Sequence, residues 1–149
     1  MISVVIATLN DERTLGETLG SLVAAAVDGL VREVIVIDAG STDQTLEIAD
    51  DAGARILKSS GPDALAQGCA MARSDWLLIL EPKTLLADGW MRAVSDHLRE
   101  HADQAAWWPA KSGPLSFFGG KPQAVLMPRK LVGPGFSGPL AAKGRRLKP

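Results

Sequence analysis

The sequence predicts an α/β fold, in which a mostly parallel central sheet carries helices on both faces. Three observations lead to this prediction. Short runs of apolar and β-branched residues alternate with helical patterns over residues 2–101. The run at 34–37, Val-Ile-Val-Ile, is apolar without a break, which is typical of a parallel strand buried on both faces. Helical segments separate successive strands, as the right-handed crossovers between parallel strands require.

The individual elements follow from their patterns in chain order. Apolar runs predict strands at residues 2–7, 34–38, 55–58 and 76–80, and helical periodicity predicts helices at 10–26, 41–52, 63–73 and 88–101. The first helix would place Leu15, Leu19, Leu22 and Val23 on one face. After residue 102 the pattern weakens, with candidate strands at 104–109 and 123–127 and a glycine-containing loop at 112–121.

Two of these helices carry signals for their starts. Ser41 and Gln44 have the spacing of a capping box, in which the two side chains satisfy free backbone N–H groups of the first turn. Asp88 stands where an N-cap residue is expected for the last helix. We therefore expect these helices to begin at residues 41 and 88.

The composition is that of a soluble globular protein. Apolar residues make up 46% and charged residues 22% of the 149 residues, which suits one core and one domain. No apolar run reaches the length of a membrane span, and the first residues lack the features of a signal peptide, so a cytoplasmic location is expected. The single cysteine, Cys69, excludes a disulfide framework or a cysteine metal site within one chain. We expect Cys69 to be a small, buried, apolar side chain.

Charge is divided unevenly along the chain. Residues 1–103 hold all 17 Asp and Glu and 8 of the 16 Lys and Arg, whereas residues 104–149 hold the other 8 basic residues and no acid. Such asymmetry is typical of proteins with an anionic partner, which would here meet the basic C-terminal segment. Alternatively, the basic segment lies across the acidic part of the same chain. We expect no nucleic-acid partner, and an oligomer is compatible with the sequence.

The most informative run is residues 33–45. An apolar strand ends at a carboxylate, Asp38, and a turn at Ala39 and Gly40 leads directly into a helix. The carboxyl ends of parallel strands, next to helix N-termini, are where open α/β sheets bind ligands. The pattern therefore predicts a binding site at Asp38. The alternative is that Asp38 is a solvated turn residue at an ordinary strand–turn–helix corner.

Three segments together resemble the family 2 glycosyltransferases. They are Ser-Val-Val-Ile-Ala-Thr-Leu-Asn-Asp-Glu at 3–12, Asp-Ala-Gly-Ser-Thr-Asp at 38–43 and Asp-Trp-Leu-Leu-Ile-Leu at 75–80. The resemblance is good over residues 2–92 and weak beyond. It implies the GT-A fold, a three-layer, Rossmann-like architecture that binds nucleotide-diphospho-sugars.

The resemblance also implies a division of the chain and a set of ligand contacts. A single GT-A-like domain over residues 1–149 would have a nucleotide-binding half at 2–102 and a truncated, basic acceptor-side half at 103–149. The nucleoside of a nucleotide-sugar donor would be held by Thr8, Asn10, Glu12 and Asp38. Asp38 would accept a hydrogen bond from an N–H group of the base, a task suited to a carboxylate.

This sequence departs from the family where the family holds a metal. The family's Asp-x-Asp motif after the fourth strand is replaced by Glu81-Pro82-Lys83. Two carboxylates suit Mg²⁺ or Mn²⁺, whereas a protonated lysine offers no lone pair. We therefore expect no divalent metal cofactor and no metal site, and we expect Lys83 to contact the diphosphate instead. The alternative is that Lys83 is a solvent-facing turn residue.

The general base of the family is also missing from its usual place. It is an acid near the C-terminal end of the catalytic domain, and no Asp or Glu follows Asp103 in this sequence. Ala66 stands where relatives carry an asparagine that contacts the donor. The catalytic residue is therefore unknown, with Glu81 as the candidate unless another subunit supplies it.

Three functional hypotheses remain open. The first is a glycosyltransferase that moves a sugar from a nucleotide-sugar to a hydroxyl acceptor, weakly or without a metal. The second is a non-catalytic protein that binds a nucleotide-sugar at Asp38, a pseudo-glycosyltransferase. The third is a scaffold that keeps only the fold and uses its basic segment and Trp107-Trp108 as a contact surface. The fold does not decide among them, because function depends on the site.

Overall fold

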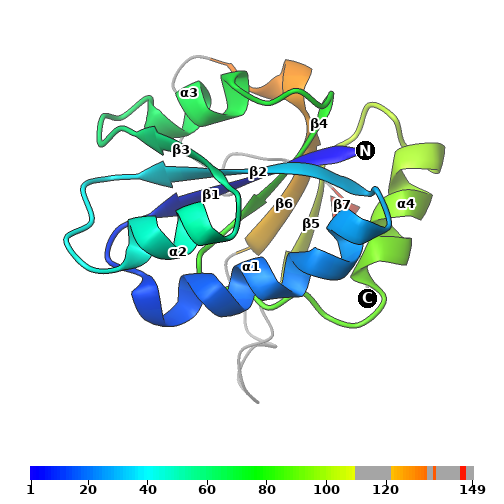
Figure 1. The fold of residues 1–149 in the computed structure, drawn as a ribbon. Helices are drawn as coiled ribbons and strands as arrows, with labels where there is room; N and C mark the ends of the chain where they lie inside the picture. Colours follow the sequence, from blue (N-terminus) through cyan, green and yellow to red (C-terminus); the bar gives the residue numbers. More distant parts are fainter. Residues whose placement is uncertain (110–121, 134–135, 137–144, 147–149) are drawn as a thin grey trace.

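The protein is built on a seven-stranded sheet with helices on both faces (Figure 1), which confirms the predicted α/β class. The computed structural model describes residues 1–109, 122–133, 136 and 145–146. The strands are β1 (Ile2–Thr8), β2 (Val31–Asp38), β3 (Arg55–Lys58), β4 (Trp76–Leu80), β5 (Ala106–Pro109), β6 (Pro122–Pro128) and β7 (Arg145–Arg146). The helices are α1 (Glu12–Val27), α2 (Thr45–Asp51), α3 (Ala64–Ala70) and α4 (Trp90–Glu100), with a 3₁₀ helix, η1, at Arg129–Leu131.

The part of the sheet that contains β1 is parallel. The strand order is β3-β2-β1-β4-β6-β5-β7. β1 pairs in parallel with β2 and β4, and β2 pairs in parallel with β3. β6 runs antiparallel to β4 and to β5. After β1 the chain builds β2 and β3 on one side and then crosses to β4 on the other, so the order reverses direction between β1 and β4.

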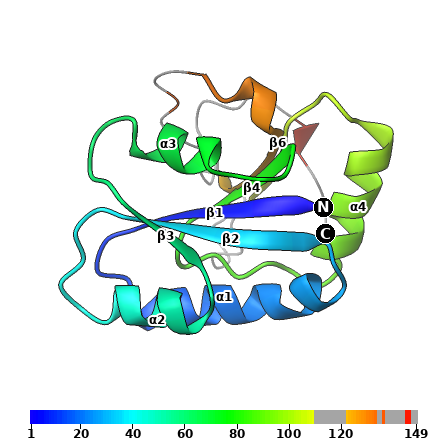
Figure 2. The ribbon, with the colours of Figure 1, turned by 45° about the horizontal axis from the view of Figure 1, so that its top comes forward.

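Apolar side chains on the two faces of the sheet form two cores. Along β1, Val4 and Ile6 join side chains of α1, α2 and α4, whereas Val5 packs with α3 on the opposite face. Figure 2 shows α1 and α2 below the sheet and α3 above it. Because side chains alternate between the faces of a strand, a strand covered on both faces needs an unbroken apolar run. This explains why unbroken apolar runs in the sequence identified these strands.

Helix α3 can lie close to the sheet because it contains a glycine. A Cβ atom placed on Gly68 would lie 2.2 Å from Cδ1 and 2.6 Å from Cγ1 of Ile37, a buried residue of β2. The next residue, Cys69, is also buried, and burial raises the pKa of its thiol to about 12. Cys69 is therefore the small buried side chain that was predicted.

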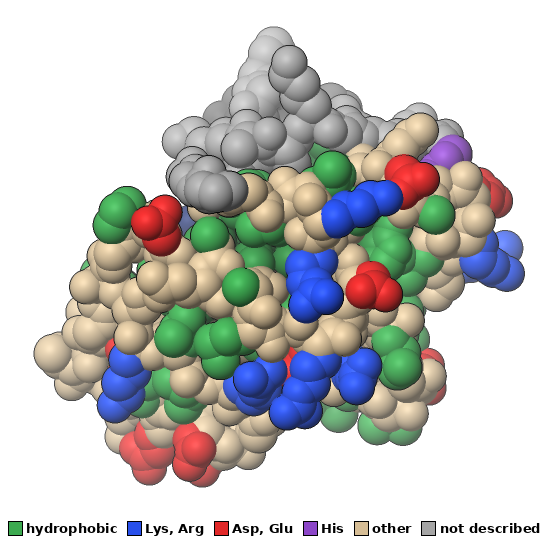
Figure 3. Space-filling model, turned by 90° about the horizontal axis from the view of Figure 1, so that it is seen from above, with side chains coloured by type: hydrophobic (Ala, Val, Ile, Leu, Met, Phe, Trp, Pro, Cys, Tyr) green, Lys and Arg blue, Asp and Glu red, His purple; other side chains and the backbone are tan. Residues whose placement is uncertain are grey.

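Arginines from three elements hold the chain segment that follows α3. Arg55 of β3, Arg129 of η1 and Arg32 of β2 donate hydrogen bonds to the backbone carbonyls of residues 71, 72 and 73, at 2.9, 2.7 and 3.3 Å. Cationic side chains favour the C-terminal end of a helix, where carbonyl groups lack helical partners. Lys and Arg side chains accordingly gather on the face of the molecule shown in Figure 3.

A buried glutamate, Glu33, is the counterion for part of this basic surface. Its side chain is 8% exposed and pairs with Arg55 at 2.9 Å. It also accepts hydrogen bonds from the hydroxyl of Ser3 and the backbone N–H of Arg73, at 2.8 and 2.6 Å. Burial acts to raise the pKa of this carboxyl, but the hydrogen bonds and the charge of Arg55 outweigh burial and hold the pKa below its ordinary value of 4.5.

Two helix starts differ from the prediction. Helix α2 begins at Thr45 rather than at residue 41, and its N-cap residue, Gln44, makes no capping bond with its side chain. The reason is that the hydroxyl of Ser41 bonds to Asp38, so the predicted capping box does not form. Helix α4 begins after Gly89, which has a φ of 85°, and Asp88 does not cap it.

Other expectations are partly confirmed. β5 and β6 occupy the two candidate strand regions after residue 102. Val23 is 58% exposed, because the buried stripe of α1 runs through Leu22 and Ala25 instead. The loop predicted at 112–121 lies outside the described residues. Within the described part of the chain, no helix has both the length and the apolar character needed to cross a membrane.

Candidate functional site

The predicted site lies at the carboxyl edge of the parallel strands. Thr8 at the end of β1 is the register partner of Asp38 at the end of β2, and Ile6 of β1 pairs with Leu80 at the end of β4. The loops that follow these three strands therefore leave the sheet side by side. The reversal of strand order between β1 and β4 falls at this edge, and such a reversal is where open α/β sheets bind ligands.

Asp38 is buried, and its carboxylate shapes the turn after β2. The residue is 2% exposed. Its oxygens accept hydrogen bonds from the backbone N–H groups of Gly40 and Ser41, each at 3.0 Å, and from the hydroxyl of Ser41. Asp38 is therefore not a solvated turn residue. The N–H of Ser41 also lies 3.3 Å from the second oxygen, so three donors make four contacts with this carboxylate.

Asn10 joins the loop after β1 to the loop after β2. Its φ of 55° is left-handed, a conformation that asparagine adopts more readily than most residues. Its N–H donates to the hydroxyl of Ser41 at 2.9 Å, and its side-chain oxygen accepts from the N–H of Thr42 at 2.8 Å. Ser41 therefore connects Asn10 to Asp38.

Glu12 and Asp43 form a second link between the same two loops. The carboxylate of Glu12 accepts from the N–H of Gln44 at 3.1 Å, and the N–H of Glu12 donates to the carboxylate of Asp43 at 3.2 Å. Asp43 also accepts from the N–H of Thr45 at 3.0 Å. Burial acts to raise the pKa of Asp43, but hydrogen bonds from Thr45 and Glu12 outweigh it and lower the pKa. The two loops are thus fixed against each other without a ligand.

The loop after β4 presents Glu81 and Lys83 to solvent. Their side chains are 41% and 64% exposed, and their charged atoms lie 3.9 Å apart. The hydroxyl of Thr18 in α1 donates to the carbonyl of Pro82 at 2.7 Å, and the N–H of Thr84 donates to the carbonyl of Glu81 at 3.0 Å. Both charged side chains therefore stand on a fixed turn and are accessible to a ligand.

The structure brings the predicted residues to one edge but gives them different surroundings. Thr8 is 3% exposed and donates its hydroxyl to the carbonyl of Ile37 at 3.3 Å, whereas Asn10 and Glu12 are exposed. Sequence reasoning missed the linking role of Ser41 and that of Asp43. Their Ser-Thr-Asp segment carried a signal, because short polar side chains often bond to nearby backbone groups.

Comparisons with known proteins establish the family of this chain. The sequence pattern of glycosyl transferase family 2 matches residues 3–136. The chain belongs to this family. Glucosyl-3-phosphoglycerate synthase of Mycolicibacterium paratuberculosis is 50% identical over 56 residues, which are 38% of this chain and 17% of that protein. A TPR repeat-containing protein of Synechococcus elongatus is 38% identical over 85 residues, covering 54% of this chain and 20% of that protein.

Solved structures share the GT-A fold, as the resemblance implied. Glucosyl-3-phosphoglycerate synthase of Mycobacterium tuberculosis, with Mn²⁺, UDP and glucosyl-3-phosphoglycerate, has a TM-score of 0.67 and 22% identity over 87% of this chain and 57% of its own. Staphylococcus aureus TarS 1–349 has a TM-score of 0.65 and 20% identity over 86% of this chain and 47% of its own. The chain thus spans 57% of the first structure and 47% of the second.

These structures correct the prediction that no divalent metal takes part. The mycobacterial synthase is solved with UDP together with Mn²⁺ and also with Mg²⁺. The prediction required two acids, but Mg²⁺ is often held by one or two carboxylates together with substrate phosphates. Among residues 1–109, 122–133, 136 and 145–146, no three His, Cys, Asp or Glu side chains form a metal site. Glu81 could supply one carboxylate, so the residues present fit a cation that a diphosphate also binds.

Proposed function

We propose that this chain binds a nucleotide-sugar donor at the carboxyl edge of its sheet and transfers the sugar to a hydroxyl acceptor. The observation that best supports the proposal is the carboxylate of Asp38, which ends β2 beside the reversal in strand order and is held in place by the turn that follows it. Membership of glycosyl transferase family 2 supports the reaction class. UDP is the nucleotide bound by the mycobacterial synthase, so UDP-sugars are the first donors to test.

The nucleoside would lie against the two linked loops. Asp38 would accept a hydrogen bond from an N–H of the base, a role suited to a carboxylate. Asn10 and Glu12, which are exposed beside this turn, would contact the ribose or the base. Thr8 is buried next to Asp38, so it would position the carboxylate rather than touch the ligand.

The diphosphate would lie against the loop after β4. Lys83 would contact phosphate oxygens as a point charge. Glu81 would hold a divalent cation jointly with the diphosphate. Such a cation, when bound, supplies positive charge to the leaving diphosphate. The separation of 3.9 Å between Glu81 and Lys83 lets both act on one end of the donor.

The acceptor hydroxyl needs a base to take its proton. Residues 104–149 contain no Asp or Glu, so an acidic base from this chain must come from residues 1–103. Glu81 is exposed at the edge where the donor's reacting end would lie, and it is our candidate for this role also. A base contributes ~10²–10⁴ in rate, so Glu81→Gln should reduce turnover by about that factor.

Donor binding is tested by thermal shift and calorimetry with UDP and UDP-glucose, with and without Mn²⁺. A ligand at about 100 times its Kd should stabilise the protein by about 2.7 kcal/mol. Lys83→Ala should weaken UDP binding about tenfold, because a phosphate contact is lost, a change of about 1.4 kcal/mol. Arg92→Ala is the matched control, since Arg92 is 89% exposed on α4.

Catalysis is tested by release of UDP from UDP-glucose with a panel of hydroxyl acceptors. If Glu81→Gln no longer responds to Mn²⁺, Glu81 binds the cation. If the variant instead loses the fall in rate at low pH, Glu81 is the base that takes the acceptor proton. UDP binding without turnover would favour the pseudo-glycosyltransferase. No stabilisation by any nucleotide would overturn the proposed function and leave the scaffold hypothesis.

A further inference from the structure

A pocket of about 310 Å³ opens at the opposite edge of the sheet from the proposed donor site. Its lining residues are Asp75, Trp76, Ala102, Pro128, Arg129 and Lys130. Trp76 begins β4 and is the register partner of Pro128, the last residue of the antiparallel β6. Both therefore lie at the amino edge of β4, whereas Glu81 follows its carboxyl edge. The volume is at the lower end of the ~300–1,000 Å³ range of small-ligand sites.

The aromatic part of the pocket is held in place from behind. Trp76 is half-buried, and its ring meets that of His97 edge-on, at 5.8 Å between centroids and 90° between planes. His97 is 2% exposed and its Nε2 lies 2.7 Å from the carbonyl oxygen of Gln104. Trp76 thus offers a fixed apolar surface rather than a mobile one, and the buried Pro128 lies beside it in the sheet.

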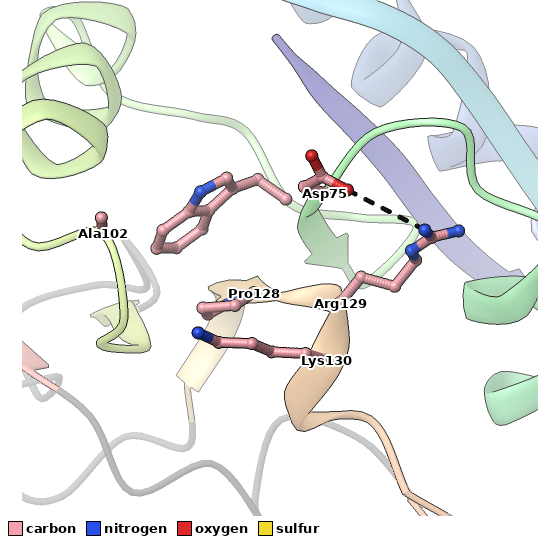
Figure 4. Close-up of a pocket in the computed structure, with 6 residues that line it drawn as sticks. Asp75, Ala102, Pro128, Arg129 and Lys130 are labelled. Carbon is pink, nitrogen blue, oxygen red and sulfur yellow. Dashed lines mark ion pairs between the residues drawn. The ribbon is translucent and has the colours of Figure 1, made fainter.

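The polar lining residues are Asp75, Arg129 and Lys130, and each cation is paired, although Asp103, the partner of Lys130, does not line the pocket. Arg129 pairs with Asp75 at 3.9 Å, and Lys130 pairs with Asp103. Arg129 is also fixed by its own bonds, because its backbone N–H donates to the carbonyl of Asp75 at 2.7 Å and its guanidinium holds the carbonyl of Ala72. Figure 4 shows Asp75 and Arg129 joined by their ion pair, with Lys130 and Pro128 side by side.

The charges of these pairs cancel, while donors and acceptors both remain accessible. Asp75 is 96% exposed, Lys130 is 65% exposed and Arg129 is 42% exposed. A charged ligand would have to displace one partner of a pair, whereas a neutral polyol can bond to carboxylate and cation together. A pyranose combines such hydroxyls with an apolar ring face, and an aromatic side chain with polar neighbours suits both surfaces.

We infer that this pocket binds one neutral sugar unit of a saccharide, at a subsite separate from the donor site. The choice of a saccharide among neutral polar ligands rests on the proposed function. The occupant would be a terminal sugar of a longer glycan, because the pocket has room for a single small ring and its rim residue Asp75 is open to solvent.

The direct test uses methyl α-D-glucopyranoside and maltohexaose on the full chain. Saturation-transfer NMR should show contact with both sugars, and one of the four tryptophan indole N–H signals should move during the titration. Trp76→Leu should remove that signal and abolish sugar binding. Because Trp76 also packs against the core, the pair Asp75→Ala and Lys130→Ala tests the exposed rim. Together they should weaken binding about tenfold, a change of about 1.4 kcal/mol.

Controls separate the alternatives. Asp96→Ala changes an exposed ion pair of α4 outside the pocket and should leave sugar affinity unaltered. Saturating UDP should not displace either sugar, and the Trp76→Leu variant should still bind UDP. A loss of sugar binding at this pocket can therefore be told apart from a loss of UDP binding at the donor site. Three results would overturn the inference: no transfer from either sugar, equal affinity in the rim variants and Asp96→Ala, or displacement of the sugars by millimolar inorganic phosphate, which would identify an anion site.

Discussion

Replacing Asp38 with alanine should destabilise the fold and weaken donor binding. The substitution removes the acceptor of three hydrogen bonds, donated by the N–H groups of Gly40 and Ser41 and by the Ser41 hydroxyl. A hydrogen bond to a charged group contributes about 1.5–3 kcal/mol. The turn is only part-buried, so water recovers some of this energy. We expect a net loss of about 2–3 kcal/mol in the free energy of unfolding.

The assay is urea unfolding followed by circular dichroism, with thermal unfolding in parallel. For a chain of this size the expected loss corresponds to a fall in Tm of roughly 5–10 °C. Asp50→Asn, at an exposed position of α2, is the matched control and should stay within about 0.5 kcal/mol of the parent protein. Equal unfolding midpoints for Asp38→Ala and Asp50→Asn would refute the reasoning.

A second variant separates the turn from the ligand contact. Ser41→Ala removes the hydroxyl that connects Asp38 and Asn10 but keeps the carboxylate. It should cost about 1 kcal/mol of stability, the usual value of one hydrogen bond, and change UDP affinity less than about threefold. Asp38→Ala should weaken UDP about tenfold or more, measured where all variants are folded. Equal losses of UDP affinity would show that the carboxylate of Asp38 does not contact the base.

Three further predictions concern the folded core. Gly68→Ala should cost about 1–3 kcal/mol in urea unfolding, because the new Cβ would overlap Ile37. The double mutant with Ile37→Val, which lacks the overlapping Cδ1, should recover part of that loss, and a purely additive effect would contradict the overlap. Glu33 has a pKa below 4.5, so its contribution is complete above that value and is lost as the pH falls through the folded pKa. Glu33→Gln should therefore lower stability at neutral pH and reduce the further loss at about pH 3, and an unchanged pH profile would argue against it. Cys69, buried and with a thiol pKa of about 12, should react with a disulfide reagent on unfolding only, and rapid labelling of the native protein would show that the site opens.

The strands of the parallel part could be predicted because burial on both faces leaves a simple apolar pattern. β4 lies where its apolar run predicted it, whereas β2 begins at Val31, before the predicted strand at 34–38, and includes the charged Arg32 and Glu33. The first residues of the helices were harder to predict, because the polar residues that cap helices also form turns. Ser41 has the right spacing for a cap, yet Asp38 is closer to it in three dimensions and takes its hydroxyl.

The site could be predicted only in part, because local sequence patterns show strand ends but not contacts between distant segments. The edge and Asp38 follow from strand direction, whereas the bonds that link Asn10 to Ser41 and Glu12 to Asp43 join segments about 30 residues apart. No local spacing encodes such contacts. The pocket at Trp76 is even harder to predict from the sequence, because the antiparallel pairing of β4 with β6 brings residue 76 to residues 102 and 128–130. The metal expectation failed because it counted protein ligands and left out the oxygens of the substrate.

The two ends of the donor site are supported by different parts of the fold. Around Asp38 the loops hold each other through hydrogen bonds at Asn10 and Glu12. The turn at Glu81 is held instead by Thr18 of α1 and by its own backbone. A change at Glu81 or Lys83 can therefore alter contacts to the diphosphate without disturbing the loops around Asp38, where the nucleoside would bind. This predicts that Asp38→Ala lowers UDP affinity, that Glu81→Gln lowers turnover, and that the two effects on turnover efficiency add within about 0.5 kcal/mol. A larger coupling energy between the two substitutions would mean that the loops around Asp38 and the turn at Glu81 move as one unit.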